Sequence, residues 1–146
     1  MLVKYLLLQK GRDVEYIYSS EPLSNAGKRL ADKNIGAVLV CDDNDRLVGI
    51  LSERDIVRII GENDLTVLAR PVCDFMKTSV IACREDDTLE FVMNLMARGG
   101  CRHIPVQRGD AICGMLSATD VVRSLDQMYC IADFTADYQT AERLAA

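Results

Sequence analysis

The chain has 146 residues, of which 49% are hydrophobic, 27% are charged and 5% are aromatic, and its formal net charge is −5. This length suits one domain or two closely packed halves, and the acidic charge disfavours nucleic acid as a partner, because binding phosphates requires a basic surface. The apolar run from Tyr5 to Leu8 is too short for a signal peptide or a membrane span. We therefore expect a cytoplasmic protein that does not enter a membrane.

The first half of the chain predicts the order strand, helix, strand, strand, helix. Ser20, Glu21 and Pro22 are residues typical of a helix start, and Gly36 interrupts the helical pattern that follows. Short apolar runs on either side of an Asp-Asn turn predict a hairpin. The expected elements are a strand over 14–18, a helix over 23–30, hairpin strands over 37–41 and 47–51, and a helix over 52–60.

The second half repeats the first. The residues G-I-L-S-E-R-D-I-V-R at 49–58 recur as G-M-L-S-A-T-D-V-V-R at 114–123, an offset of 65, and upstream of the hairpin tip the offset is 66. Two copies of one unit are expected to pack against each other and bury a common apolar face. The expected elements of the second copy are a strand over 80–83, a helix over 89–98 capped at 86–88, strands over 104–107 and 111–116, and a helix from 117 onward.

A short helical segment is predicted to open each copy. Residues 2–9 would open the first copy, and a helical turn over 72–76, within the linker 62–77, would open the second. The region from 126 onward is amphipathic and alanine-rich, which predicts a helix. The expected division is an N-terminal helix over 1–10, a first repeat over 11–70, a second repeat over 76–132 and a C-terminal tail over 133–146.

The cysteines and acidic residues do not suggest a metal site. The six cysteines contain no C-x-x-C pair, and the chain has a single histidine to assist them. Asp42, Asp43 and Asp45 lack the glycine and the distal glutamate of a calcium loop, which favours a solvated hairpin tip. Cysteines in or beside strands are expected to act as small hydrophobes, and Cys101 or Cys130 leaves a redox-sensing role as an alternative.

Each repeated motif places a serine and an aspartate at a helix start. Ser52 and Asp55 do so in the first copy, and Ser117 and Asp120 in the second. One interpretation is structural, because this spacing forms a capping box that satisfies the first backbone N–H groups of the helix. The other is functional, because a carboxylate can accept both hydrogen bonds of a ribose diol while the helix start attracts a phosphate.

These motifs resemble those of tandem cystathionine β-synthase-type (CBS) domains, a module that binds adenosine nucleotides in many regulatory proteins. The family's pattern hydrophobic-x-hydrophobic-Ser/Thr-x-x-Asp, at the turn from strand to helix, matches at 49–55 and again at 114–120. The resemblance covers about residues 11–132. It implies an α/β (α+β) fold in which two βαββα repeats pack about a pseudo-two-fold axis and leave a cleft between their sheets.

The resemblance also implies two sites that differ. Residues 102–105 carry the family's proline and a basic pair where its members place phosphate contacts, whereas 36–40 has neither. We therefore expect the site around the second copy to hold phosphate more strongly, with Arg54, Arg58 and Arg123 as further charges. Protonation of the histidine near neutral pH would tune that affinity. The residues expected to bind nucleotide are Ser52, Arg54, Asp55, Arg102, His103, Ile104, Pro105, Ser117 and Asp120.

The sequence predicts a binding module and not an enzyme. No nucleophile has a base beside it, and no Walker-type phosphate loop or dinucleotide fingerprint follows a strand. The predicted function is to sense an adenine nucleotide (AMP, ADP, ATP or NAD(H)), held without covalent attachment, and to pass that state to an unknown regulated protein or through the chain's own homodimer. The apolar helical faces 56–60 and 121–125 are the expected dimer contacts.

Three alternatives remain from the sequence. The chain could be an interaction scaffold that binds no nucleotide, in which the serines and aspartates act only as caps. It could be a redox-linked regulator that uses Cys101 or Cys130 at its surface. S-adenosylmethionine or RNA as the ligand fits the family, but no residue pattern supports either, and the acidic charge weighs against RNA.

Overall fold

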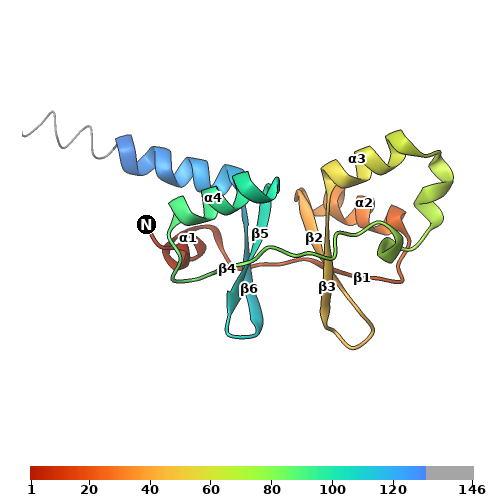
Figure 1. The fold of residues 1–146 in the computed structure, drawn as a ribbon, viewed down its shortest axis with the longest axis horizontal. Helices are drawn as coiled ribbons and strands as arrows, with labels where there is room; N and C mark the ends of the chain where they lie inside the picture. Colours follow the sequence, from red (N-terminus) through yellow and green to blue (C-terminus); the bar gives the residue numbers. More distant parts are fainter. Residues whose placement is uncertain (131–146) are drawn as a thin grey trace, which may run out of the picture.

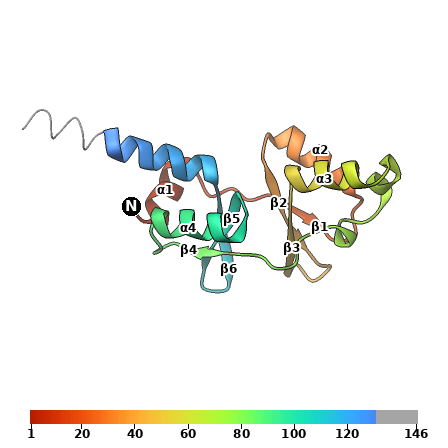
Figure 2. The same cartoon turned by 45° about the horizontal axis from the view of Figure 1, so that its top comes forward.

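The structure, a computed structural model, describes residues 1–130. Two halves lie side by side, and each contains a three-stranded sheet with helices packed on it (Figure 1). One sheet has the strand order β1-β2-β3 and the other β4-β5-β6. The predicted α+β class and the predicted repeat are confirmed. The tips of both hairpins point to the same side, and α3 and α4 lie at the opposite ends of the hairpins (Figures 1 and 2).

The first half follows the predicted order of elements. Strand β1 runs parallel to β2, and β2 runs antiparallel to β3. All five residues of β2 are buried, as expected for the central strand of a sheet that helices cover. The elements are β1 (Tyr16–Tyr18), α2 (Leu23–Lys33), β2 (Ala37–Cys41), β3 (Leu47–Ser52) and α3 (Glu53–Glu62), followed by the 3₁₀ helices η1 (Leu65–Ala69) and η2 (Val72–Asp74).

The second half has the same topology. Both hairpins carry a register shift at the equivalent place, between Val40 and Cys41 in one half and between Val106 and Gln107 in the other. The elements are β4 (Cys83–Arg84), α4 (Leu89–Gly99), β5 (His103–Arg108) and β6 (Ala111–Ser117), followed by a helix over 118–130. The part of the predicted C-terminal helix and tail beyond 130 lies outside the described residues.

Three local predictions differ from the structure. Strands β1 and β4 begin later than the predicted positions 14 and 80, because the residues before them run between the two halves and pair with neither sheet over their full length. The residues 20–22 were predicted to supply a cap with the proline in the first turn of the helix, but Pro22 is itself the N-cap of α2 and no side chain caps it. Glu21 accepts a hydrogen bond from the backbone N–H of Tyr18 at 2.8 Å.

Each opening segment packs against the half that does not directly follow it along the chain. Helix α1 (Val3–Lys10) joins the core of the second half, and η2 joins the core of the first (Figure 1). Equivalent backbone bonds hold them: the N–H of Val3 donates to the carbonyl of Asp87, and the N–H of Val72 donates to the carbonyl of Glu21. Along the chain, α1 precedes the first repeat and η2 precedes the second. Each covers the apolar helix start of the other repeat, so the chain crosses between the halves twice.

Two equivalent glycines let the opening segments approach the sheets. A Cβ atom on Gly114 of β6 would lie 2.7 Å from Cδ2 of Leu7, and one on Gly49 of β3 would lie 2.7 Å from Sδ of Met76. Any larger side chain at either position would therefore push against a packed segment. This requirement explains why glycine stands at the start of both copies of the repeated motif.

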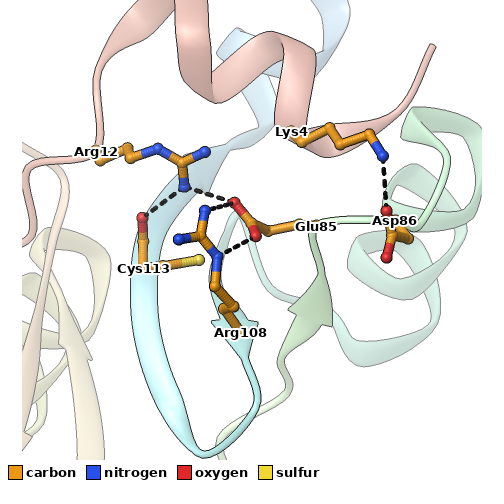
Figure 3. Close-up of polar contacts among 6 residues, drawn as sticks. All are labelled: Lys4, Arg12, Glu85, Asp86, Arg108 and Cys113. Atoms are coloured by element: carbon orange, nitrogen blue, oxygen red, sulfur yellow. Dashed lines mark hydrogen bonds and ion pairs between the residues drawn. The ribbon is translucent and has the colours of Figure 1, made fainter.

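A cluster of ion pairs binds Arg12, in the segment that follows α1, to the second half (Figure 3). Glu85 accepts a hydrogen bond from Nη1 of Arg12 at 2.6 Å and is bound by two nitrogens of Arg108, one of them at 2.8 Å. The two guanidinium groups lower the pKa of Glu85 to about 2. Beside this cluster, Lys4 of α1 binds Asp86 at 2.9 Å. The segment that leaves α1 is thus held by charge as well as by apolar packing.

The helical faces predicted as dimer contacts are mostly occupied within the chain. Ile56 and Ile59 belong to the core of the first half, and Val121 and Leu125 belong to the core of the second. Within these two faces, the exposed large apolar residues are Val57, 71% exposed, and Val122, 57% exposed. Within residues 1–130, no helix has the length and apolar character needed to cross a bilayer.

Candidate functional site

Both repeated motifs form the helix caps that their spacing predicts. The backbone N–H of Ser52 donates to Oδ2 of Asp55 at 2.9 Å, and the N–H of Asp55 donates to Oγ of Ser52 at 3.2 Å. In the second half, Ser117 and Asp120 exchange the same two bonds at 2.8 and 3.1 Å. The caps account for one carboxylate oxygen of each aspartate. The structural interpretation of the motif is therefore realised, and any ligand must use what the caps leave free.

A lysine at the end of α1, or shortly after η2, binds each aspartate. Nζ of Lys77 lies 3.1 Å from Oδ1 of Asp55, and Nζ of Lys10 lies 2.7 Å from Oδ2 of Asp120. Lys10 also donates to the backbone carbonyl of Met115 at 2.6 Å. The two-fold relation of the halves thus extends to an ammonium group at each helix start. Through these ion pairs, the charged aspartates help to hold α1 and the segment after η2 in place.

The two aspartates differ in how much of each carboxylate stays available. In Asp55 the cap uses Oδ2 and Lys77 faces Oδ1, and the side chain is 8% exposed. In Asp120 both the cap and Lys10 use Oδ2, and the side chain is 25% exposed. No hydrogen bond found within residues 1–130 uses Oδ1 of Asp120. Only the aspartate of the second half can therefore offer a free oxygen to a ligand.

Both aspartates are ionised at neutral pH. Burial alone would raise the pKa of Asp55, but the bonds from Ser52 and the ammonium of Lys77 outweigh it and lower the pKa. Burial would likewise raise the pKa of Asp120, and the bonds from Lys10 and Ser117 lower it below its usual value. Charged carboxylates are acceptors only, so each suits a hydroxyl donor such as a ribose diol.

Two cavities of very different size lie at the helix starts. The larger, about 640 Å³, is lined by Lys10, by Ser117, Thr119 and Asp120 at one wall, and by 33–37 and Glu53 at the other. The smaller, about 120 Å³, is lined by Ser52, Asp55 and Lys77, among others. Pockets that hold small molecules occupy about 300–1,000 Å³. Of these two cavities, the larger one, at Asp120, is in that range.

Arg102 and His103 line both cavities, because they lie where the two halves meet. The imidazole of His103 packs over Gly36, where a Cβ atom would lie 2.5 Å from Nε2. Burial lowers the pKa of His103 and the guanidinium of Arg102 lowers it further, so the imidazole is neutral at pH 7. Arg102 therefore carries the positive charge of this pair.

The remaining predicted residues fall into two groups. Arg54 and Arg58 line the smaller cavity, as Ser52 and Asp55 do. Ile104 and Pro105 are buried in β5 and line neither of these two cavities. The sequence analysis missed Lys10 and Lys77, which lie 67 residues apart, close to the repeat offset. This spacing could have indicated that the two lysines occupy equivalent positions in the two repeats.

Burial disfavours the thiolate form of several cysteines. Burial raises the pKa of Cys101, and it also raises the pKa of Cys83 to about 12, so these thiols carry little reactive thiolate. Cys41 is buried too, consistent with its predicted role as a small hydrophobe. Within residues 1–130, no cluster of His, Cys, Asp or Glu side chains could hold a metal ion.

Comparison with known proteins identifies the family. The CBS domain model matches residues 11–62 and 72–127, one match for each half. The chain therefore belongs to the CBS-domain family, whose proteins are generally regulatory and non-catalytic. An uncharacterized 17.7 kDa protein of Acidianus ambivalens is 31% identical over 104 residues, which is 70% of this chain and 62% of that protein. The chain thus spans less than two thirds of that relative.

Solved structures share the fold. A CBS-domain containing protein of Agrobacterium tumefaciens has a TM-score of 0.81 and 34% identity, covering 84% of this chain and 91% of its own. A CBS domain protein of Pyrobaculum aerophilum, solved with AMP, has a TM-score of 0.71 and 22% identity, covering 82% and 89%. A CBS domain pair solved with 5′-methylthioadenosine and S-adenosylmethionine has a TM-score of 0.76 and 23% identity, covering 88% and 98%.

Proposed function

We propose that this chain is a regulatory module that binds one adenine nucleotide in the larger cavity and passes that state to a regulated protein or through its own homodimer. The observation that carries the proposal is a cavity of about 640 Å³ whose rim holds a serine, an ionised aspartate with a free oxygen, and the start of the 118–130 helix. A carboxylate at that rim suits the two hydroxyls of a ribose, and the helix start suits a phosphate.

The ligand would be placed by residues from both halves. Ser117 and Asp120 would bind the ribose, and Arg102 would approach the 5′ substituent from the meeting point of the halves. Ile35 and Ala37 on the opposite wall offer apolar surface for the base. The AMP and adenosyl ligands of structurally similar CBS proteins support this ligand class.

Regulation would follow from a ligand that contacts both halves and from the position of Lys10. A ribose bound to Oδ1 of Asp120 would share this carboxylate with the ammonium of Lys10, which binds Oδ2 and is the last residue of α1. A ligand that favours one arrangement of α1 and the two halves would shift the population toward it. The surface around Val57 and Val122 offers exposed apolar side chains for the homodimer or for a regulated partner.

The test compares the two aspartates by isothermal titration with AMP. An asparagine can still accept the capping bond, so Asp120→Asn removes the charge without removing the cap. Because hydrogen bonds to charged groups contribute about 1.5–3 kcal/mol, Asp120→Asn should weaken AMP binding by about 10- to 150-fold. The matched variant Asp55→Asn, beside the smaller cavity, should leave the affinity within about threefold and the stoichiometry at one AMP per chain.

An interaction scaffold without a ligand is the second candidate. It is favoured by one observation: both carboxylates already make cap bonds and ion pairs. Thermal unfolding separates the two, because a ligand at about 100 times its dissociation constant stabilises a binder by about 2.7 kcal/mol and a scaffold not at all. The absence of any shift with AMP, adenosine or S-adenosylmethionine would favour the scaffold.

A further inference from the structure

We infer that the larger cavity selects adenosine ligands that carry no more than one phosphate, and that Glu53 and Asp13 exclude di- and triphosphates. This inference rests on the proposed function and narrows its ligand class. It follows from the charges that line the cavity and from which of them are already paired. The ionisable residues of the lining are Lys10, Asp13, Glu15, Lys33, Glu53, Arg102, His103 and Asp120.

Two of the three cations of the lining are already engaged. Lys10 binds Asp120 at 2.7 Å, and Nζ of Lys33 lies 3.5 Å from Oε1 of Glu15. Among the ion pairs of residues 1–130, none involves Arg102, and the imidazole beside it is neutral at pH 7. One guanidinium is therefore left to balance the charge of a ligand.

Two carboxylates of the cavity lining have no cation partner. They belong to Asp13 and Glu53, and neither takes part in an ion pair within the described residues. The C-terminal end of α2 also reaches the cavity at Lys33 and Asn34, and a helix presents the negative end of its dipole there. Phosphates that extend across the cavity would meet two carboxylates and the end of that dipole.

The helix start at the ribose side has few donors to spare. The N–H of Ala118 donates to the carbonyl of Arg102 at 2.8 Å, and the N–H of Asp120 donates to Oγ of Ser117. The remaining donors of this first turn, together with the guanidinium of Arg102, suit one phosphate or an uncharged substituent. A second and a third phosphate would have to pass toward Asp13 and Glu53, where like charges repel.

The experiment titrates adenosine, AMP and ATP into the protein in magnesium-free buffer at low salt. AMP should bind at least about tenfold more tightly than ATP, and the gap should shrink as salt screens the carboxylates. Glu53→Gln should tighten ATP binding by about three- to tenfold and change AMP binding by less than about twofold. Glu62→Gln makes the same chemical change at the end of the same helix, away from the cavity, and should change neither.

The outcomes separate the inference from the function on which it rests. If ATP binds as tightly as AMP, or if Glu53→Gln leaves their ratio unchanged, the charge selection is wrong while the nucleotide module stands. If adenosine, AMP and ATP all fail to bind, the proposed function is itself wrong and the inference falls with it. Circular dichroism of each variant checks that the fold is retained.

Discussion

Leu7 provides the sharpest test of the exchanged packing of α1. Its side chain is 1% exposed in the core of the second half, whereas Leu8, the next residue of the same helix, is 72% exposed. Truncating a buried leucine removes its transfer free energy and leaves a cavity, which together cost about 2–5 kcal/mol. We therefore expect Leu7→Ala to lower the free energy of unfolding by about 3 kcal/mol, and Leu8→Ala to change it by about 0.5 kcal/mol or less.

The measurement is urea unfolding followed by circular dichroism, with the slope m compared between variants. Equal losses for the two variants, or a loss below about 1 kcal/mol for Leu7→Ala, would refute the packing of α1 on the second sheet.

A double-mutant cycle with Gly114→Ala adds a direct measure of contact. The new methyl group would press on the side chain of Leu7, since its carbon would lie 2.7 Å from Cδ2. In the Leu7→Ala background that clash is absent, so Gly114→Ala should cost less there. A coupling of about 0.5–3 kcal/mol is expected for residues in contact, and additive effects would show that the two positions do not touch.

Three further predictions follow from the structure. The pKa of Glu85 is about 2 against an ordinary 4.5, so its ion pairs stabilise the fold fully above about pH 5 and lose that effect as the pH falls from about 4.5 to about 2. The free energy of unfolding, measured in urea across this range, should therefore fall more steeply for the wild type than for Glu85→Gln. Parallel curves for the two proteins would contradict this prediction. His103 is the single histidine, so its NMR signal can be followed alone, and it should titrate below pH 6.5 because burial lowers its pKa. Gly36→Ala should shift that signal, whereas Gly27→Ala, which adds a methyl group in open space, should leave it in place. Titration above pH 6.5, or an equal shift in both variants, would count against the packing of the imidazole on Gly36. The homodimer implied by the family would use the exposed side chain of Val57, so light scattering should give a dimer for the wild type and a monomer for Val57→Lys; a monomeric wild type would remove the homodimer.

Local geometry made much of the fold predictable. A serine and an aspartate three residues apart form a capping box wherever a helix begins, so Ser117 and Asp120 could be placed from their spacing alone. The repeat also predicted that both hairpins share one design, including the turn residues 42–45 at the tip of the first. There Asp42 accepts bonds from the N–H groups of Asn44 and Arg46, as a solvated tip requires.

The exchange of the opening segments was not predictable from the same pattern. Val3 and Val72 are equivalent residues, and both are completely buried. Equivalence holds whether each packs on its own repeat or on the other, so the offset cannot distinguish the two arrangements. The choice depends on the path of the chain between the halves. That path also delivers Lys10 and Lys77 to the aspartates, which is why neither lysine was predicted as a site residue.

The double crossing has a consequence for the order in which the protein can form during synthesis. Helix α1 leaves the ribosome well before the sheet that shelters its apolar face, which ends at Ser117. The first half, by contrast, is complete once η2 has been made at Asp74. Until β6 has been made, α1 must wait with Leu6 and Leu7 uncovered, so a chaperone that captures apolar nascent segments should engage this helix early and release it only after Ser117 has emerged.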